Sequence, residues 1–215
     1  KKLIKEQANA SNYLKAIREV HQSNPTIQIA GISTEPTTYK EFPNLIRGIK
    51  EMGLVCGLHT KGYRLKDEIA SEYLKPSKDN SECFITFSLD SSNKKHYLDL
   101  HDIADRKDKL GNHADNYFDI VIKNIKHLYL EKKRLGINLR INITYLLFQE
   151  NSTDASIDEA IDLIYEYCDS LRFTIPQSRN DGIINNNYIS NNKKSYLYDL
   201  KEKMTKYNKI RVLED

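Results

Sequence analysis

The 215-residue sequence has no apolar run that approaches the roughly 20 residues needed to span a bilayer, and no recognisable signal peptide. It also has little net charge, because 33 basic and 30 acidic residues are interspersed along it. An extended nucleic-acid-binding surface would need clustered Lys and Arg side chains. We therefore expect neither a membrane nor a nucleic acid among its partners.

Cysteine is scarce, with three scattered residues at Cys56, Cys83 and Cys168. An odd number without close spacing argues against a disulfide scaffold and favours a reducing, cytoplasmic location. An initiator methionine is also absent, and the chain begins at Lys1 in a helix-like pattern. We interpret the sequence as a piece whose natural start lies upstream, long enough for one domain with a real core.

Helical and strand-like patterns alternate along the chain, which predicts an α/β fold with parallel strands. Strands are predicted over 26–33, 54–59, 83–89, 139–147 and 170–176. Helices are predicted over 3–22, 42–49, 64–74, 118–129 and 157–168, with a last one through Leu197, Leu200 and Met204. Ser156 and Glu159 are spaced as the capping box of the helix that contains Ile157. The polar stretch 91–115 has no clear periodicity and predicts an excursion over one mouth of the fold.

Strand phase distinguishes a closed or partly closed barrel from an open doubly wound sheet. Three predicted strands each have one apolar and one polar face. The polar faces contain Thr86, Ser88, Asp90, Arg140, Asn142, Thr144, Arg172 and Thr174. An open parallel sheet is covered by helices on both sides and should be apolar on both. A barrel whose polar interior holds water or a ligand is therefore the better interpretation, unless these are edge strands.

A carboxylate follows the first predicted strand in the stretch IQIAGISTEPTTY, residues 27–39. Glu35 precedes Pro36, which biases it towards extended geometry. One interpretation is an ordinary strand-to-helix turn with a solvated Glu. The other is a ligand-binding carboxylate, because the carboxyl ends of parallel strands carry the sites of such folds.

Four segments, in this order and spacing, resemble the barrel of radical S-adenosylmethionine (radical SAM) enzymes. Residues 31–36, GISTEP, resemble the family's GGEP motif, with Ser33 and Thr34 in place of glycines. Residues 60–63 resemble a TNG-type strand exit, and residues 87–90 an SLD stretch. The helix over 117–136 and the strand over 140–151 resemble the family's next helix and strand.

The resemblance implies a partial (βα)6-type TIM-like barrel over the single domain 1–215. Its core would span 1–176, and 177–215 would add an Asn-rich loop and a C-terminal helix. The implied activity is reductive cleavage of SAM, at a 4Fe–4S cluster, to a 5′-deoxyadenosyl radical that abstracts hydrogen from a peptide or small-metabolite substrate. An electron donor such as flavodoxin or ferredoxin is implied as well.

Site residues follow from the resemblance and from strand phase. Glu35 would accept the SAM ammonium group, beside the backbone of Ser33, Thr34 and Pro36. Further cofactor-binding candidates are Ser88, Asp90, Asn142 and Thr144. Substrate or cavity candidates are His59, Arg140, Arg172 and Thr174. No catalytic residue is assigned.

The sequence departs from the family in lacking its CxxxCxxC cluster loop. The three cysteines are interpreted as buried structural residues, so no metal ligand is expected in this chain. The cluster ligands and the first strand would lie before Lys1. The alternative is a barrel that binds SAM, a nucleotide or a peptide without a cluster and without catalysis. Convergent acids or a metal site for a hydrolase or lyase are not found, and His96, His101 and His113 have no compact metal-site spacing.

Overall fold

The computed structural model describes residues 9–20, 26–31, 34–101, 116–175 and 193–213. The strands are β1 (Thr26–Ile29), β2 (Val55–Thr60), β3 (Cys83–Ser88), β4 (Leu139–Leu146), β5 (Ser170–Thr174) and β6 (Ile210–Leu213). The α-helices are α1 (Ala10–Val20), α2 (Phe42–Glu51), α3 (Asp67–Tyr73), α4 (Lys94–Leu100), α5 (Tyr117–Leu135), α6 (Asp154–Ile164) and α7 (Lys193–Met204). Short 3-10 helices are η2 (Pro36–Thr38), η4 (Gln149–Asn151) and η5 (Tyr165–Tyr167). No described helix combines the length and the apolar composition that crossing a membrane requires.

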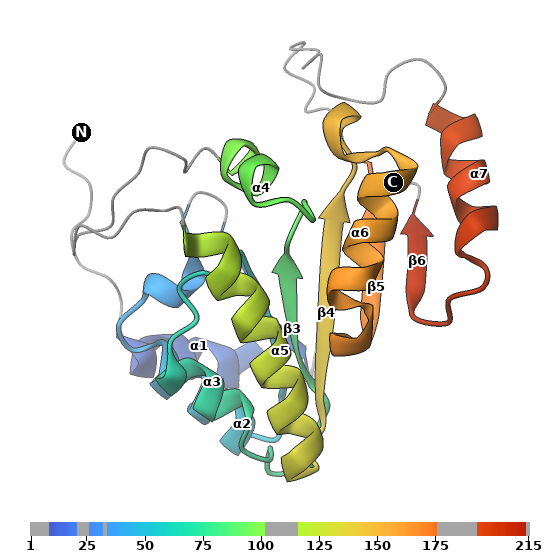
Figure 1. The fold of residues 1–215 in the computed structure, drawn as a ribbon. Coiled ribbons are helices and arrows are strands. Elements are labelled where there is room, and N and C mark those ends of the chain that lie inside the picture. The colour runs from blue at the N-terminus through green and yellow to red at the C-terminus, as the bar shows by residue number, and fades with distance from the viewer. Residues whose placement is uncertain (1–8, 21–25, 32–33, 102–115, 176–192, 214–215) are drawn as a thin grey trace. The chain divides into compact units, whose positions relative to one another are not determined.

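The strands form one sheet in the order β1-β2-β3-β4-β5-β6, so each strand pairs with the next one along the chain. The pairs β1–β2, β4–β5 and β5–β6 have a parallel register, and each consecutive pair of strands is joined through at least one helix (Figure 1). Parallel neighbours connected in this way form repeated βα units. The prediction of an α/β fold with parallel strands is confirmed.

Contacts group the chain into two compact units. Unit 1 comprises Lys1–Thr60, Arg64–Ile85 and Leu130–Arg140, and unit 2 comprises Lys61–Tyr63, Thr86–Tyr129 and Ile141–Asp215. The expected single domain over 1–215, with a core over 1–176, stays a prediction. An Asn-rich loop is expected within 177–215. Its part up to residue 192 lies outside the described residues.

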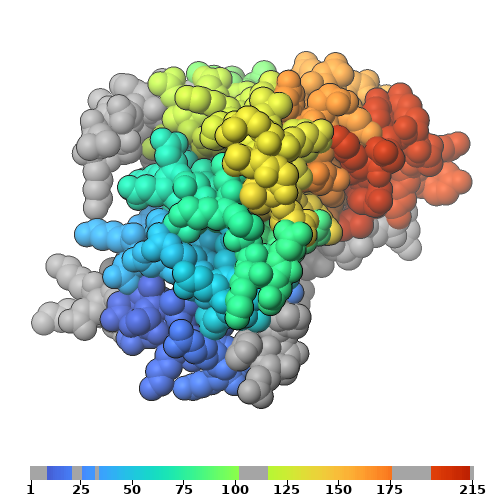
Figure 2. Space-filling model, turned by 90° about the horizontal axis from the view of Figure 1, so that it is seen from below, coloured from blue at the N-terminus to red at the C-terminus, as the bar shows by residue number. Residues whose placement is uncertain are grey.

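In unit 1, α2 contacts both α1 and α3 (Figure 1, Figure 2). Phe42, Ile46 and Ile49 recur at helical spacing on its inner face and are at most 1% exposed. Leu58 of β2 is fully buried as well. Burial of large apolar side chains of this kind is the dominant favourable contribution to folding, so this face anchors α2 in the core of unit 1.

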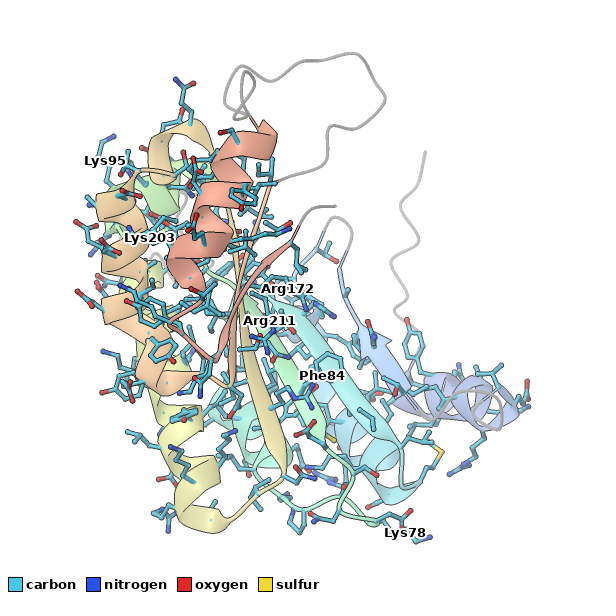
Figure 3. The ribbon with its side chains drawn as sticks, turned by 90° about the vertical axis from the view of Figure 1, so that its right-hand side faces the viewer. Lys78, Phe84, Lys95, Arg172, Lys203 and Arg211 are labelled. Atoms are coloured by element: carbon cyan, nitrogen blue, oxygen red, sulfur yellow. The ribbon has the colours of Figure 1, made fainter. Side chains whose placement is uncertain are left out.

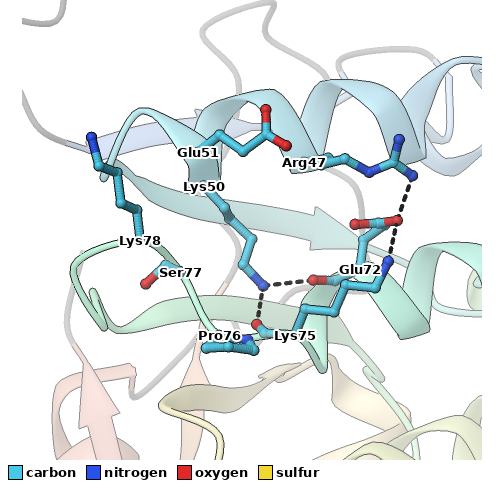
Figure 4. A pocket seen from close by; sticks show the side chains of 8 residues that line it. All are labelled: Arg47, Lys50, Glu51, Glu72, Lys75, Pro76, Ser77 and Lys78. Atoms are coloured by element: carbon cyan, nitrogen blue, oxygen red, sulfur yellow. Dashed lines mark hydrogen bonds and ion pairs between the residues drawn. The ribbon is translucent and has the colours of Figure 1, made fainter.

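The buried ammonium group of Lys50 caps the C-terminal end of α3 (Figure 4). Lys50 is 5% exposed, and its Nζ donates hydrogen bonds to the carbonyl oxygens of Glu72, at 2.6 Å, and of Lys75. The last carbonyls of a helix have no partner within the helix, so a cation there satisfies them. Burial lowers the pKa of Lys50.

A hollow of about 450 Å³ lies beside this ammonium group and is rich in charge. The Glu72 carboxylate accepts hydrogen bonds from Arg47, at 2.6 Å, and from Lys75, at 2.8 Å, as Figure 4 shows. The Glu72 carboxylate is thus shared by two cations, and the Lys50 ammonium group is occupied by carbonyl oxygens. We therefore assign the hollow a structural role.

In unit 2, β4 and β5 have one buried apolar face and one more exposed polar face. The buried face contains Ile141, Ile143, Tyr145, Leu171 and Phe173, all fully buried. Arg172 is exposed on the opposite face, where Asn142 and Thr144 are half-buried. The predicted alternation of faces is therefore confirmed for these strands, and it leaves polar groups available on one side of the sheet.

The structure corrects two local predictions. The N-cap of α6 is Thr153, whose hydroxyl accepts a hydrogen bond from the backbone N–H of Ser156, so the capping box of Ser156 and Glu159 is wrong. The stretch 91–115 is not wholly irregular, because α4 occupies part of it and is capped by the Asn93 side chain. Residues 102–115, including His113, lie outside the described residues.

Replacing Lys50 with methionine should lower the free energy of unfolding by about 2–3 kcal/mol, because charged hydrogen bonds to buried carbonyls are lost and the carbonyls are left unpaired. Lys78→Met is the matched control, since the Lys78 side chain is exposed at the same hollow. Urea denaturation of both variants measures the difference. Equal stability of the two variants would contradict the capping role of Lys50.

Candidate functional site

The turn after β1 holds a carboxylate at the carboxyl ends of β1 and β2. Glu35 is extended, with φ −74° and ψ 119°, and Pro36 opens η2 directly after it. Its Oε1 accepts a hydrogen bond from the Thr37 hydroxyl, at 2.9 Å, and another from the Thr60 hydroxyl. Thr37 and Thr60 are each 3% exposed, whereas Glu35 is half-buried. Two buried hydroxyls thus orient a partly exposed carboxylate.

The same turn depends on a glycine at position 31. A Cβ atom placed on Gly31 would lie 1.6 Å from the carbonyl oxygen of Thr34. No side chain can be accommodated at that distance, so the backbone of the turn closes on itself only because residue 31 is glycine. Thr34 is exposed next to Glu35, and Ser33 lies outside the described residues.

A hollow of about 370 Å³ lies beside this turn within unit 1. Its lining includes Tyr13, Ile27, Thr34, Pro36 and Tyr39. The rings of Tyr13 and Tyr39 meet edge to face, with their centroids 5.9 Å apart. The turn that positions Glu35 therefore borders a partly aromatic cavity large enough for part of a small molecule.

In unit 2, Asp90 follows β3 and is buried. Its backbone is left-handed, with φ 54°, and its side chain is 6% exposed. Oδ1 accepts a hydrogen bond from the backbone N–H of Leu146, at 2.9 Å, and Asn151 Nδ2 donates to the Asp90 carbonyl, at 2.7 Å. These bonds join the exit of β3 to the end of β4. Ser88, the last residue of β3, remains half-buried.

Asp90 also faces a histidine. Its Oδ2 lies 3.7 Å from Nε2 of His101, whose side chain is 7% exposed. This distance is too long for a hydrogen bond, and Nε2 has no hydrogen-bond partner among the described residues. Burial raises the pKa of Asp90 to about 7 and lowers that of His101 to about 4, and the charge of Lys61 lowers both values.

The remaining predicted site residues lie at different positions along their strands. Asn142, Thr144 and Arg172 share the polar face of β4 and β5, while Thr174, at the end of β5, is 6% exposed. Arg140 lies at the start of β4 and pairs with Glu82. In unit 1, the ring of His59 on β2 meets Phe84 edge to face, 5.9 Å between centroids. Unit 1 thus brings together Thr34, Glu35 and Pro36, and unit 2 brings together Asn142, Thr144 and Arg172.

Two hydroxyls of the site are missed by sequence reasoning about individual side chains. Thr37 lies in the segment around Glu35, but its contact with the carboxylate depends on the turn. Thr60 lies 25 residues further along the chain, at the end of β2. Its only signal is its position at the start of the segment 60–63, which resembles a strand exit.

The cysteines do not fit an iron–sulfur cluster. Cys56, Cys83 and Cys168 are buried, and no group of three His, Cys, Asp or Glu side chains in the described ranges could hold a metal ion. Burial raises the pKa of the Cys56 and Cys168 thiols to about 12, which favours the protonated form that binds metals poorly. No step of a reaction is therefore derived through a cluster on these residues.

Replacing Asp90 with asparagine should change how stability depends on pH. In the wild type, the raised pKa of Asp90 makes stability fall as pH rises from about 4 to about 7, because the folded state binds the extra proton. The lowered pKa of His101 has the opposite effect: it makes stability rise with pH between about pH 4 and pH 6.5. Asp90→Asn removes the first contribution, so its stability relative to wild type should rise through this window, by up to about 4 kcal/mol.

Urea denaturation from pH 4 to pH 7.5 measures this difference, with Asp99→Asn as the control at an exposed carboxylate. A constant difference between Asp90→Asn and wild type across the window would contradict the buried, protonated state of Asp90.

A scan against protein-family models finds no match, and a search of curated proteins finds none either. Solved structures do match. Streptococcus suis SuiB bound to S-adenosylmethionine has a TM-score of 0.69 at 15% identity over 97% of this chain, and SuiB bound to its precursor peptide SuiA has 0.67 at 14% over the whole chain. TYW1 with a bound lysine–pyruvate adduct has 0.53 at 13% over 96% of this chain.

This chain spans 44% of the length of SuiB and 62% of that of TYW1. At these identities the likeness concerns the fold alone. The predicted fold class is thereby confirmed: the chain has an α/β fold with six parallel strands in one sheet, which matches a partial TIM-like barrel.

Proposed function

We propose that this chain is the SAM-binding barrel of a radical SAM enzyme, and that Glu35 accepts the ammonium group of SAM. The geometry of Glu35 carries the proposal. Its carboxylate is half-buried at the carboxyl ends of two parallel strands, which is where open and closed α/β folds bind their ligands. The fold likeness to a SAM-bound structure supports the same assignment.

The hydroxyls of Thr37 and Thr60 give the carboxylate a fixed orientation before a ligand arrives. A preorganised group loses less side-chain freedom on binding, so more of the interaction energy appears as affinity. The bond between a carboxylate and an ammonium group is charge-assisted and roughly twice as strong as a neutral hydrogen bond. The backbone of Thr34 and Pro36, and of Ser33, would flank the same ammonium group.

In unit 2, Ser88, Asn142 and Thr144 are proposed as cofactor-binding residues, and their side chains are neutral and half-buried. Hydroxyl and amide groups of this kind suit ribose hydroxyls and a carboxylate, because they donate and accept hydrogen bonds. The Asp90 carboxylate is already engaged by Leu146 and faces His101, so a ligand would have to displace these contacts.

The reaction proposed for the complete enzyme is reductive cleavage of SAM to a 5′-deoxyadenosyl radical that abstracts hydrogen from a peptide or small-metabolite substrate. A 4Fe–4S cluster would supply the electron, delivered in the cytoplasm by a donor such as flavodoxin or ferredoxin. Its ligands are proposed to lie outside the described residues, because the buried cysteines do not fit.

Replacing Glu35 with glutamine should weaken SAM binding at least about tenfold, since loss of one charge-assisted hydrogen bond costs roughly 1.5–3 kcal/mol. Glutamine keeps the shape of the side chain, so the fold should be retained. Isothermal titration calorimetry with SAM measures the change, and Glu51→Gln, at an exposed carboxylate of the same unit, is the control. Unchanged affinity in Glu35→Gln would show that the carboxylate does not bind the ammonium group.

Catalysis is tested separately on the natural full-length protein, reconstituted anaerobically with iron and sulfide and then reduced. We expect 5′-deoxyadenosine to form from SAM, measured by liquid chromatography. Iron-independent SAM binding without 5′-deoxyadenosine would instead identify a non-catalytic binding barrel. Absence of SAM binding would contradict a SAM-binding barrel, with or without catalysis.

A further inference from the structure

Two arginines lie side by side on the polar face of unit 2. Arg172 of β5 is in register with Thr144 of β4 on one side and with Arg211 of β6 on the other. Register partners in a parallel sheet are about 4.8 Å apart and direct their side chains to the same face. Thr144, Arg172 and Arg211 therefore form one row across three strands.

The row is accessible among the described residues. Arg172 and Arg211 are both exposed, whereas Phe173 and Ile210, on the opposite face of the same strands, are buried. Figure 3 shows the two arginines on one face of the strands. The neighbouring row, two residues earlier on each strand, pairs Asn142 with Ser170 and adds an amide and a hydroxyl.

The two guanidinium groups are not neutralised within the described ranges, where neither forms an ion pair with a carboxylate. Arg211 Nη1 donates only to backbone carbonyl oxygens, of Asn208 at 3.0 Å and of Ile210 at 2.9 Å, which orient the group. Like charges directly opposite each other on neighbouring strands are destabilising. An anion between the two groups removes this repulsion.

Arginine suits such an anion because its planar fork donates paired hydrogen bonds to the oxygens of a carboxylate or a phosphate. Two forks in one row, with hydroxyl and amide donors beside them, surround one oxyanion with donors. Arg140 does not join this group, because it lies at the start of β4 and pairs with Glu82.

We propose that Arg172 and Arg211 bind a carboxylate or phosphate group of the substrate. This inference rests on the proposed function for the identity of the bound molecule as substrate, but anion binding itself does not. Glu35, the residue proposed for the SAM ammonium group, belongs to unit 1, whereas the two arginines belong to unit 2. The anion is assigned to the substrate, and the SAM affinity of Arg211→Gln tests this assignment.

Titrations of the full chain with sodium phosphate and with sodium succinate, in the absence of SAM, test the site. The thermal unfolding midpoint is followed against sodium chloride at matched ionic strength. We expect saturable stabilisation of the wild type by at least one of the two anions. Arg172→Gln and Arg211→Gln should each weaken that anion at least about tenfold, whereas Arg134→Gln, at an exposed arginine paired with Glu131, should bind it like wild type.

Stabilisation by phosphate alone or by succinate alone supports the site and identifies which oxyanion the substrate carries. No stabilisation beyond chloride, or stabilisation that persists in both variants, overturns it. SAM affinity measured on Arg211→Gln separates the two proposals. Unchanged affinity is expected, and a loss comparable to that of Glu35→Gln would assign the anion to SAM. Glu35→Gln should retain anion binding, so either proposal can fail alone.

Discussion

Side-chain alternation along parallel strands is the constraint on which the architecture and its chemistry depend. On β4 and β5, apolar residues such as Ile143 and Phe173 are fully buried. Because successive side chains of a strand point to opposite faces, the residues between them lie on the other face of the sheet. That face contains amide, hydroxyl and guanidinium groups, which are costly to bury without partners. A sheet of this kind is stable only if its polar face stays hydrated or meets a polar ligand. Stability and ligand binding thus arise from one pattern.

Two acidic residues, Glu35 and Asp90, follow the carboxyl ends of strands. Their carboxylates are held in different ways. Glu35 is oriented by two hydroxyls and remains partly exposed. Asp90 is bonded to the backbone N–H of Leu146 and lies beside an imidazole, and its burial raises its pKa. A half-buried, preoriented carboxylate is suited to a charged ligand, whereas a fully buried one acts on the local backbone. The difference in burial separates two roles that the same residue type can have.

Much of the fold was predictable because apolar periodicity is a local signal. The five predicted strands and the helix α5 follow directly from it, within a few residues at their ends. β6 was not predicted, because four residues with one arginine carry too little periodicity, and Arg211 was missed with it. The N-cap of α6 was misplaced because Thr153 and Ser156 are both good capping residues, and only the backbone geometry distinguishes them.

The candidate site was predictable to a lesser extent. Strand phase correctly indicated that Arg140 and Arg172 share one face of the sheet. It carries no information on the position of a residue along its strand, so the pairing of Arg140 with Glu82 was not predicted. The contact of Thr60 with Glu35 joins two strands and exists only after they pair. Sequence patterns thus identify elements and faces, whereas contacts between elements depend on the register.

The three buried cysteines have a practical consequence for handling the protein. Cys56 and Cys83 are at most 2% exposed and Cys168 is fully buried. Burial raises the pKa of the Cys56 and Cys168 thiols to about 12, so at neutral pH these two have almost no thiolate to react. Alkylating reagents will therefore modify these side chains mainly when the surrounding structure opens. Because Cys56 and Cys83 belong to unit 1 and Cys168 to unit 2, the rate of modification at each position reports on local opening of its own unit, without any added label.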